Sequence, residues 1–417
     1  MRSLLAPLLL TGALATPALA VTPDEVVETY ADIALATYED SLTTAKTLQV
    51  AVAALVANPS DETLAAAKTA WLAARVPYQQ SEAFRFGNPV VDDWEGRVNA
   101  WPLDEGLIDY TSADYGNEEN ALATLNVIAT PKFTLSGTEI DATTITPDLI
   151  ARTLHEADGI EANVASGYHA IEFLLWGQDL NGTGPGAGSR PYTDFALGDA
   201  CTGGNCDRRA AYLQAATDLL VADLQEMVGA WSEGGAGRSA VTADPKAGLL
   251  AALTGMGTLS YGELGGERMK LGLMLNDPEE EHDCFSDNTH NSHYYDGLGI
   301  RNVYFGQYTR VDGTKVEGPS LSALVPAVDP AIDAQLKAEL DASVAALGAV
   351  KAAGDAGQTF DTLIAPGNAE GETLILTTVT ALVTQTVSID RAVTALGLTK
   401  VEFEGSDSLD NPGAVFQ

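Results

Sequence analysis

Residues 167–179 read GYHAIEFLLWGQD, and the apolar run up to Trp176 predicts a buried helix. His169 and Glu172 stand three residues apart in this run, so a helix places them on one face. An imidazole nitrogen and a carboxylate oxygen in that position can bind one cation, and this pair suits iron, zinc or copper better than calcium. The alternative is a His hydrogen-bonded to a neighbouring Glu inside a helical core. Both groups need a polar partner there, and a metal ion would serve both.

The rest of the chain shows mainly helical patterns. Apolar residues recur at helical spacing in residues 332–347 and 375–396, for example. Strand patterns are short and local, at Lys132–Leu135 and Asn302–Phe305. The predicted fold class is therefore all-α, built from helical bundles. Helices with readable boundaries are expected at residues 23–57, 61–85 with a kink at Pro77, 206–231 and 245–274.

Two long segments have no regular pattern. Residues 177–207 are rich in Gly, Asn, Ser and Pro, and residues 277–318 combine acids and aromatics with three of the five His. Long ordered loops in a helical protein are typical of lids and binding segments. Gly234–Asp244 also lacks apolar periodicity. We therefore expect a boundary there between an N-terminal half, residues 21–235, and a C-terminal half, residues 236–417.

The charge of the chain restricts its partners. Its 417 residues include 22 Lys and Arg against 58 Asp and Glu, for a net charge of −36. Such a protein repels nucleic acids and anionic lipid surfaces and attracts cations. Nucleic acid is therefore excluded as a partner, and 46% hydrophobic residues are enough for a sizeable core.

The N-terminus has the pattern of an export signal. Residues 1–20 read MRSLLAPLLLTGALATPALA, with Arg2 before a short apolar stretch and a small-x-small site ending at Ala20. We expect cleavage near Ala20 and a periplasmic or secreted mature chain. No later segment has about 18 uninterrupted apolar residues, so no transmembrane segment is expected in the mature chain.

Three cysteines fit an oxidising compartment. Cys201 and Cys206 lie in the sequence CTGGNC, where two glycines permit a tight closed loop. A disulfide between them is expected outside the cytoplasm. Half of a metal site is the alternative, but the chain has no second cysteine pair to complete it.

At this point the sequence resembles a known family. GYHAIEFLLWGQD is similar to the Gly-x-His-x-x-Glu signature of the imelysin family, and most closely to its iron-regulated protein A branch. Four further blocks resemble the same branch, so the resemblance runs from about Val21 to the C-terminus. These blocks are residues 75–110, residues 206–231, GELGGERM at residues 262–269, and residues 279–308 with EEEHDCFSDNTH and GIRNVYFGQY.

The resemblance implies a fold and a metal site. Imelysin-like proteins are exported or envelope-associated, and two helical-bundle-like halves pack together into one imelysin-like domain with a site between them. Relatives in iron-uptake systems bind metal through the His-x-x-Glu pair and acidic residues of another helix. His169 and Glu172 carry over directly as ligands, and Glu82 is the best-matching third ligand.

Other residues are candidates for the surroundings of that site. Arg75, Asp104 and Glu105 could orient ligands or hold an anion beside the metal. His282 belongs to an acidic, His-containing loop, and the resemblance implies that it lies at the site between the halves. The alternative is that this loop is exposed to solvent and binds nothing. Two further acids one helical turn apart either face the same cleft, pair with a neighbouring Arg268 or Lys270, or face water: Glu263 and Glu267.

The predicted function is binding of a transition metal, most favourably iron, with zinc and copper as alternatives. The protein would assist iron uptake or homeostasis, in contact with an envelope iron-transport system. The rival is an envelope metallopeptidase, because the founding family member is described as an insulin-cleaving enzyme. A His-Glu-x-x-His motif is missing, since His155-Glu156 is followed by Gly159 where the second His would stand. A module that binds a carbohydrate or a haem-like ligand is the third possibility.

Overall fold

The computed structural model describes residues 21–113, 115, 120–399 and 401–416, and the expected signal peptide lies outside them. The α-helices are α1 (Pro23–Ala57), α2 (Asp61–Ser81), α3 (Pro89–Asn99), α4 (Pro147–Leu149), α5 (Gly167–Trp176), α6 (Cys206–Trp231), α7 (Ala236–Thr242), α8 (Pro245–Thr258), α9 (Gly272–Leu275), α10 (Thr289–Phe305), α11 (Leu321–Leu324), α12 (Pro330–Asp355), α13 (Phe360–Leu363), α14 (Ala369–Ala395) and α15 (Asp407–Asp410). The strands are β1 (Lys132–Leu135), β2 (Thr138–Asp141), β3 (Gln307–Thr309) and β4 (Lys315–Glu317). The π-helices are η3 (Ile150–Leu154) and η7 (Leu259–Leu271), and the 3-10 turns are η1 (Glu82–Phe84), η2 (Glu105–Leu107), η4 (Ala157–Gly159), η5 (Tyr192–Phe195), η6 (Gly198–Ala200), η8 (Pro278–Glu280), η9 (Val325–Ala327) and η10 (Ala414–Phe416).

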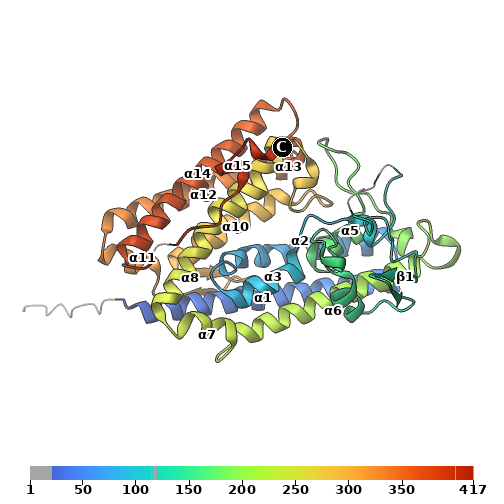
Figure 1. Ribbon diagram of the computed structural model, residues 1–417, viewed down its shortest axis with the longest axis horizontal. Coiled ribbons are helices and arrows are strands. Elements are labelled where there is room, and N and C mark those ends of the chain that lie inside the picture. The colour runs from blue at the N-terminus through green and yellow to red at the C-terminus, as the bar shows by residue number, and fades with distance from the viewer. Residues whose placement is uncertain (1–20, 114, 116–119, 400, 417) are drawn as a thin grey trace, which may run out of the picture.

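The long helices pack in two groups joined by α10. In one group α1 packs against α2, α6 and α8, and in the other α14 packs against α12 and η7. Helix α10 packs against both α2 and α12, so it lies between the groups (Figure 1). The four strands form two separate antiparallel hairpins, β1–β2 and β3–β4. The fold is all-α, as the sequence predicts.

Local signals place the first helices where the sequence predicts them. Thr22 caps α1, since its side chain accepts from the backbone nitrogen of Glu25 and the Glu25 carboxylate accepts from Thr22. Ser60 caps α2 in the same way. Pro77 is accommodated within α2, and the regular helix ends at Ser81 and continues as η1. Helix α6 has the predicted bounds.

The strand predicted at Asn302–Phe305 is wrong, because these residues end the helix α10. Most of the segment predicted to be irregular before them is also helical. The apolar pattern of α10 is hidden by glycines at its contacts, since a Cβ atom at Gly299 would collide with the backbone of Gln80 in α2. The predicted boundary segment Gly234–Asp244 likewise contains the short helix α7. The other predicted strand, Lys132–Leu135, is confirmed as β1.

One helix meets the length and composition of a membrane span, although no such segment was expected. Helix α14 is long and apolar enough, and close to half of its most apolar window is buried within the protein. A core helix of a soluble protein has the same composition. In this fold α14 buries Ile375, Leu382 and Ile389 along one face, which packs on α12 and η7.

Candidate metal centre

Helix α5 carries the two residues that the sequence singles out, and all ten of its residues are buried. It begins at Gly167, whose φ of 79° favours glycine. A Cβ atom there would also collide with the carbonyl group of Val98 in α3. Trp71 of α2 donates from Nε1 to the carbonyl oxygen of Tyr168, 2.9 Å away. These contacts seat α5 tightly against α2 and α3.

His169 and Glu172 lie side by side on one face of α5. Nδ1 of His169 is 3.1 Å from Oε2 of Glu172. Oε1 of Glu172 accepts hydrogen bonds from the backbone nitrogen and the hydroxyl of Ser286, at 2.9 and 2.6 Å. The second ring nitrogen of His169, Nε2, is buried and has no hydrogen-bond partner among the residues that the structure describes. The hydrogen bond between the two residues therefore uses only one nitrogen of His169, and the other imidazole nitrogen is free to bind a ligand.

The segment between η8 and α10 brings His282 and Asp283 to the same place. One donor atom from each of His169, His282 and Asp283 lies within 4.8 Å of the other two. The two imidazole rings are 4.9 Å apart between centroids, and His169 Nδ1 is 3.9 Å from Asp283 Oδ1. We call these three residues together with Glu172 the candidate metal centre. All four are at most 2% exposed.

Asp283 is held by a shell of donors. Nη2 of Arg75 lies 2.7 Å from its Oδ1, within a fully buried ion pair. Asn288 donates to Oδ2 at 2.7 Å, and the Ser292 hydroxyl donates to the same oxygen. The backbone nitrogen of Asp283 donates to Oγ1 of Thr289 at 2.9 Å. Its carboxylate orientation is therefore set by the protein before any ion arrives.

Two amides determine which nitrogen of His282 carries the proton. Nη1 of Arg75 donates to Oδ1 of Asn99 at 2.6 Å, so the Asn99 nitrogen faces Nε2 of His282, 3.4 Å away. The Gln79 nitrogen donates to Asp296, which turns the amide oxygen of Gln79 toward Arg75 and toward Nδ1 of His282. Nδ1 therefore carries the hydrogen, and the lone pair of Nε2 accepts a long hydrogen bond from Asn99, which a metal ion would replace.

Burial and charge favour neutral imidazoles beside an ionised aspartate. Burial, assisted by the positive charge of Arg75, lowers the pKa of His169 to about 3. Burial also lowers the pKa of His282 well below its usual value. It would raise the pKa of Asp283, but Arg75 reverses the effect and the net shift is downward. Burial and the charge of Asp283 raise the pKa of Glu172 well above its usual value. Neutral imidazole is the form that binds metals.

The structure places Glu82 in a neighbouring cluster. Its Oε2 is 2.7 Å from Nη2 of Arg268. The same nitrogen is 2.7 Å from Oε1 of Glu263, and Nη1 of Arg268 is 3.0 Å from Oδ2 of Asp296. His282 and Asp283, rather than Glu82, are the residues that approach His169. Glu263 takes the second of its three predicted alternatives, the ion pair with Arg268.

The remaining sequence candidates fall into two sets. Arg75 contacts the candidate metal centre directly, through Asp283. Asp104 accepts hydrogen bonds from the Tyr115 hydroxyl, at 3.2 Å, and from Asn120. Glu105 is buried in η2. Glu267 lines a cavity beside Ser406 and Asp407. Asp104 thus bonds to Tyr115 and Asn120, and Glu267 lies at a different cavity.

The sequence did not assign Asp283 to the site of His169. It placed the residue only among the acids of the loop around His282, which could attract a hard cation. The signal was its place directly after His282, since the imidazole and the carboxylate of adjacent residues reach one point here. The two cysteines of CTGGNC, by contrast, form the disulfide Cys201–Cys206, so their sulfurs are not metal ligands.

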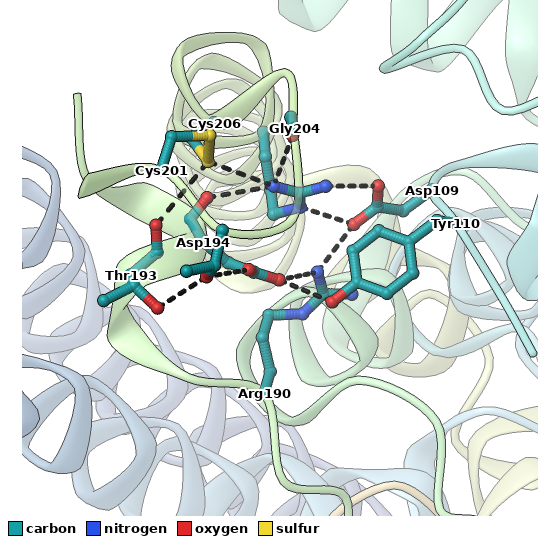
Figure 2. Close-up of a disulfide and its surroundings, with 10 residues drawn as sticks. Asp109, Tyr110, Arg190, Thr193, Asp194, Cys201, Gly204 and Cys206 are labelled. Atoms are coloured by element: carbon teal, nitrogen blue, oxygen red, sulfur yellow. Dashed lines mark hydrogen bonds and ion pairs between the residues drawn. A yellow bond between two sulfur atoms is a disulfide. The ribbon is translucent and has the colours of Figure 1, made fainter. Parts of the chain in front are cut away.

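The disulfide belongs to a buried ionic network that fastens the loop before α6 (Figure 2). Arg209 binds Asp109 with two hydrogen bonds, at 2.6 and 2.8 Å. Arg190 reaches both Asp109 and Asp194, at 2.7 and 3.1 Å, and the Tyr110 hydroxyl donates to Asp194 at 2.6 Å. This network fixes the long segment that follows α5, although most of it is irregular.

The other two histidines of the acidic region lie on α10. Nε2 of His290 is 3.6 Å from Oδ1 of Asp355 in α12. His293 is fully buried, with its ring edge-on to Phe360 at 4.9 Å between centroids. Neither ring nitrogen of His293 has a hydrogen-bond partner in the described part of the chain. Burial therefore favours the neutral form of His293.

This burial predicts a dependence of stability on pH. Burial lowers the pKa of His293 to about 3, whereas the unfolded chain has a value near 6.5. Below pH 6.5 the unfolded state binds a proton that the folded state excludes, so stability falls with pH down to about pH 3. The slope from this residue is about 1.4 kcal/mol per pH unit. Urea unfolding of metal-free protein between pH 7.5 and 5 measures this effect. As the pH falls, the free energy of unfolding should decrease less steeply for His293→Leu than for the wild type. Above pH 6.5 the free energies of the two proteins should change in parallel, and equal slopes below pH 6.5 would contradict the prediction.

Comparison with known proteins identifies the class. Residues 34–389 match the model of the family described as Imelysin, and the chain belongs to this family. No curated protein is significantly similar to the chain.

Two of the solved structures that match the chain illustrate the shared fold. One is described as an iron-regulated protein A precursor from Parabacteroides distasonis; it has a TM-score of 0.63 and 22% identity, covering 89% of this chain and 94% of that one. An imelysin-like protein from Psychrobacter arcticum has a TM-score of 0.56 and 16% identity, covering 93% and 100%. The family and the all-α fold expected from the sequence are thereby confirmed.

Proposed function

We propose that this chain is an exported imelysin-family protein that binds a transition-metal ion, iron, and assists its uptake or homeostasis. The ion would be held at the candidate metal centre by His169, His282, Asp283 and Glu172. The observation that carries the proposal is the convergence of two neutral imidazoles and an oriented carboxylate, one of the imidazoles having a buried nitrogen without a partner. The iron-regulated protein A named among the similar structures supports the choice of metal.

The donor set favours iron(II) among the divalent ions. Two histidines and one carboxylate on one face are the ligands of non-haem iron(II) sites, and they leave coordination positions open for a third acid or a small ligand. Glu172 can supply that acid, since its Oε2 is already 3.1 Å from His169. Zinc accepts the same donors in a tetrahedral arrangement. The choice between the two metals therefore has to be measured.

The burial of the centre favours an ion over a polypeptide substrate. A protease must bring a peptide bond to within about 3 Å of its metal and its base. Here all four donors are at most 2% exposed, and Trp101 stacks edge-on to His282 at 5.2 Å. A metal ion can reach such a site through a small opening, whereas a polypeptide needs a cleft.

Anaerobic titration calorimetry with iron(II), zinc and copper(II) tests the proposal. The wild-type chain should bind one iron, and His169→Ala combined with Glu172→Ala should weaken binding at least about 100-fold, more than the loss of a supporting residue would. The matched control is His290→Ala with Asp355→Ala, a second His–carboxylate pair that is not among the four donors. It should keep the wild-type affinity within about twofold. Equal iron affinity of the double variant and the wild type would reject the site.

The peptidase alternative is tested on the same proteins. Metal-loaded chain is incubated with unfolded protein substrates, with and without chelator. No cleavage is expected. Chelator-sensitive cleavage that disappears in Glu172→Ala would favour the enzyme instead.

A further inference from the structure

A second group of acids gathers beside the candidate metal centre. Asp179 follows α5, Asp287 lies just before α10, and Asp361 belongs to α13. One carboxylate oxygen from each lies within 4.8 Å of the other two. Three segments that are far apart in the sequence therefore place negatively charged side chains close together, where they repel one another.

The charges of this group are not neutralised by the protein. Among the described residues, none of the three aspartates forms an ion pair with Lys or Arg. Asp361 is 1% exposed, and neither of its carboxylate oxygens has a hydrogen bond of good geometry within residues 21–113, 115, 120–399 and 401–416. Burial raises the pKa of Asp361, and the nearby Thr359 hydroxyl and Thr362 backbone nitrogen only partly offset this effect. Asp287 is 8% exposed, and its Oδ1 likewise has no hydrogen bond of good geometry among the described residues. A buried carboxylate without a partner is costly, so this arrangement calls for a cation.

A fourth carboxylate feels the charge of the group. Glu281 is 2% exposed and forms no ion pair among the described residues, and the Thr289 hydroxyl is the hydrogen-bonding group near its carboxylate. Its charge is repelled by Asp361, Asp287 and Asp179. Burial and the two neighbouring aspartates raise the pKa of Asp287 to about 7. The repulsion that a bound cation would relieve is thus shared by all four acids.

Asp179 offers a route from solvent. It is half-buried, and its Oδ1 accepts from the backbone nitrogen and the side chain of Asn181, at 2.9 and 2.7 Å. These two hydrogen bonds orient the carboxylate and leave Oδ2 free of them. An ion can therefore approach from this side without crossing the core.

We propose that Asp179, Asp287 and Asp361 bind one hard divalent cation, calcium, at a site separate from the candidate metal centre. Calcium takes oxygen ligands only and tolerates irregular geometry, whereas magnesium requires a near-ideal octahedron. The three aspartates offer oxygen only, while the candidate metal centre offers two imidazoles, so the two sites select different ions. The inference goes beyond the proposed iron function and does not depend on it.

Calcium calorimetry and thermal unfolding of the full chain test the site. The wild type should bind one calcium, and Asp361→Asn should weaken binding at least about tenfold, because affinity follows the number of charged ligands. In EDTA the variant should melt no lower than the wild type, since it removes an unpaired buried charge. In saturating calcium the order should reverse. A residue with a purely structural role would not produce this crossover.

Three further proteins complete the experiment. The exposed Asp93→Asn should bind calcium like the wild type, and the half-buried Asp179→Asn repeats the test where Asp361→Asn does not fold. His169→Ala with Glu172→Ala should bind calcium normally, so failure of the iron proposal leaves this one standing. Magnesium or manganese binding tighter than calcium would overturn the choice of ion. No binding of any of the three ions, or equal affinity in Asp361→Asn, would overturn the site.

Discussion

Replacing His282 by alanine is expected to lower the affinity for iron(II) at least about 100-fold, because the centre loses one of its two nitrogen donors. Replacing Glu82 by glutamine is expected to change it by no more than about threefold, because that carboxylate binds Arg268 instead. Competition with a coloured iron(II) chelator, under anaerobic conditions, measures both affinities. The comparison decides between the ligand that the family resemblance implies and the one that the structure brings to His169.

The two variants need a check on folding, since both residues are buried. Circular dichroism and thermal unfolding without metal show whether each chain retains its structure. His282→Gln is the milder variant and should also lose most of the affinity. A large loss in Glu82→Gln together with wild-type binding in His282→Ala would restore Glu82 as the third ligand.

Replacing Arg268 by methionine is expected to lower the free energy of unfolding by about 3–5 kcal/mol, because it leaves buried carboxylates without their partner. Arg268 is fully buried and lies within 3.0 Å of Glu82, Glu263 and Asp296. Burial raises the pKa of Asp296 and Arg268 opposes the effect, whereas Arg268 holds the pKa of Glu263 below its usual value. Without the guanidinium both pKa values rise in the folded state. The folded variant then takes up protons as the pH falls. Its loss of unfolding free energy relative to the wild type should therefore be smaller at pH 5 than at pH 8. Urea unfolding at the two pH values measures both effects.

Arg238 is the matched control. It lies 2.6 Å from Glu28 and 2.8 Å from Asp32, but both acids are more than half exposed. Arg238→Met should therefore cost no more than about 1 kcal/mol, with little dependence on pH. Similar losses in the two variants would mean that burial does not control the strength of these ion pairs.

The sequence predicts the fold well where helices bury one continuous apolar stripe. Helices α1 and α6 have the expected bounds. A capping box marks the start of α1, and periodic apolar side chains mark both helices locally. Helix α10 was not predictable in this way. It is buried on several sides and makes its contacts through glycines such as Gly299, so it has no stripe to detect. The π-helix η7 was predicted only as part of a longer helix, since nothing in its residues marks the change in hydrogen bonding.

The candidate site was predictable only in part, for a similar reason. His169 and Glu172 are neighbours on one helix, so their spacing alone brings them together. The approach of Asp283 from more than 100 residues away depends on how α10 is anchored and on Arg75, which no local pattern encodes. Glu82 lies in the expected helical region, but the ion pair with Arg268 turns it toward a different cluster. Long-range partners decide these assignments.

The nearly complete enclosure of the four donors has a kinetic consequence. An ion bound at the proposed centre would enter and leave through a small opening or a local fluctuation of the surrounding chain, and the rate of that step would limit its exchange. A loaded chain would then keep its ion through dilution for longer than the equilibrium constant alone suggests.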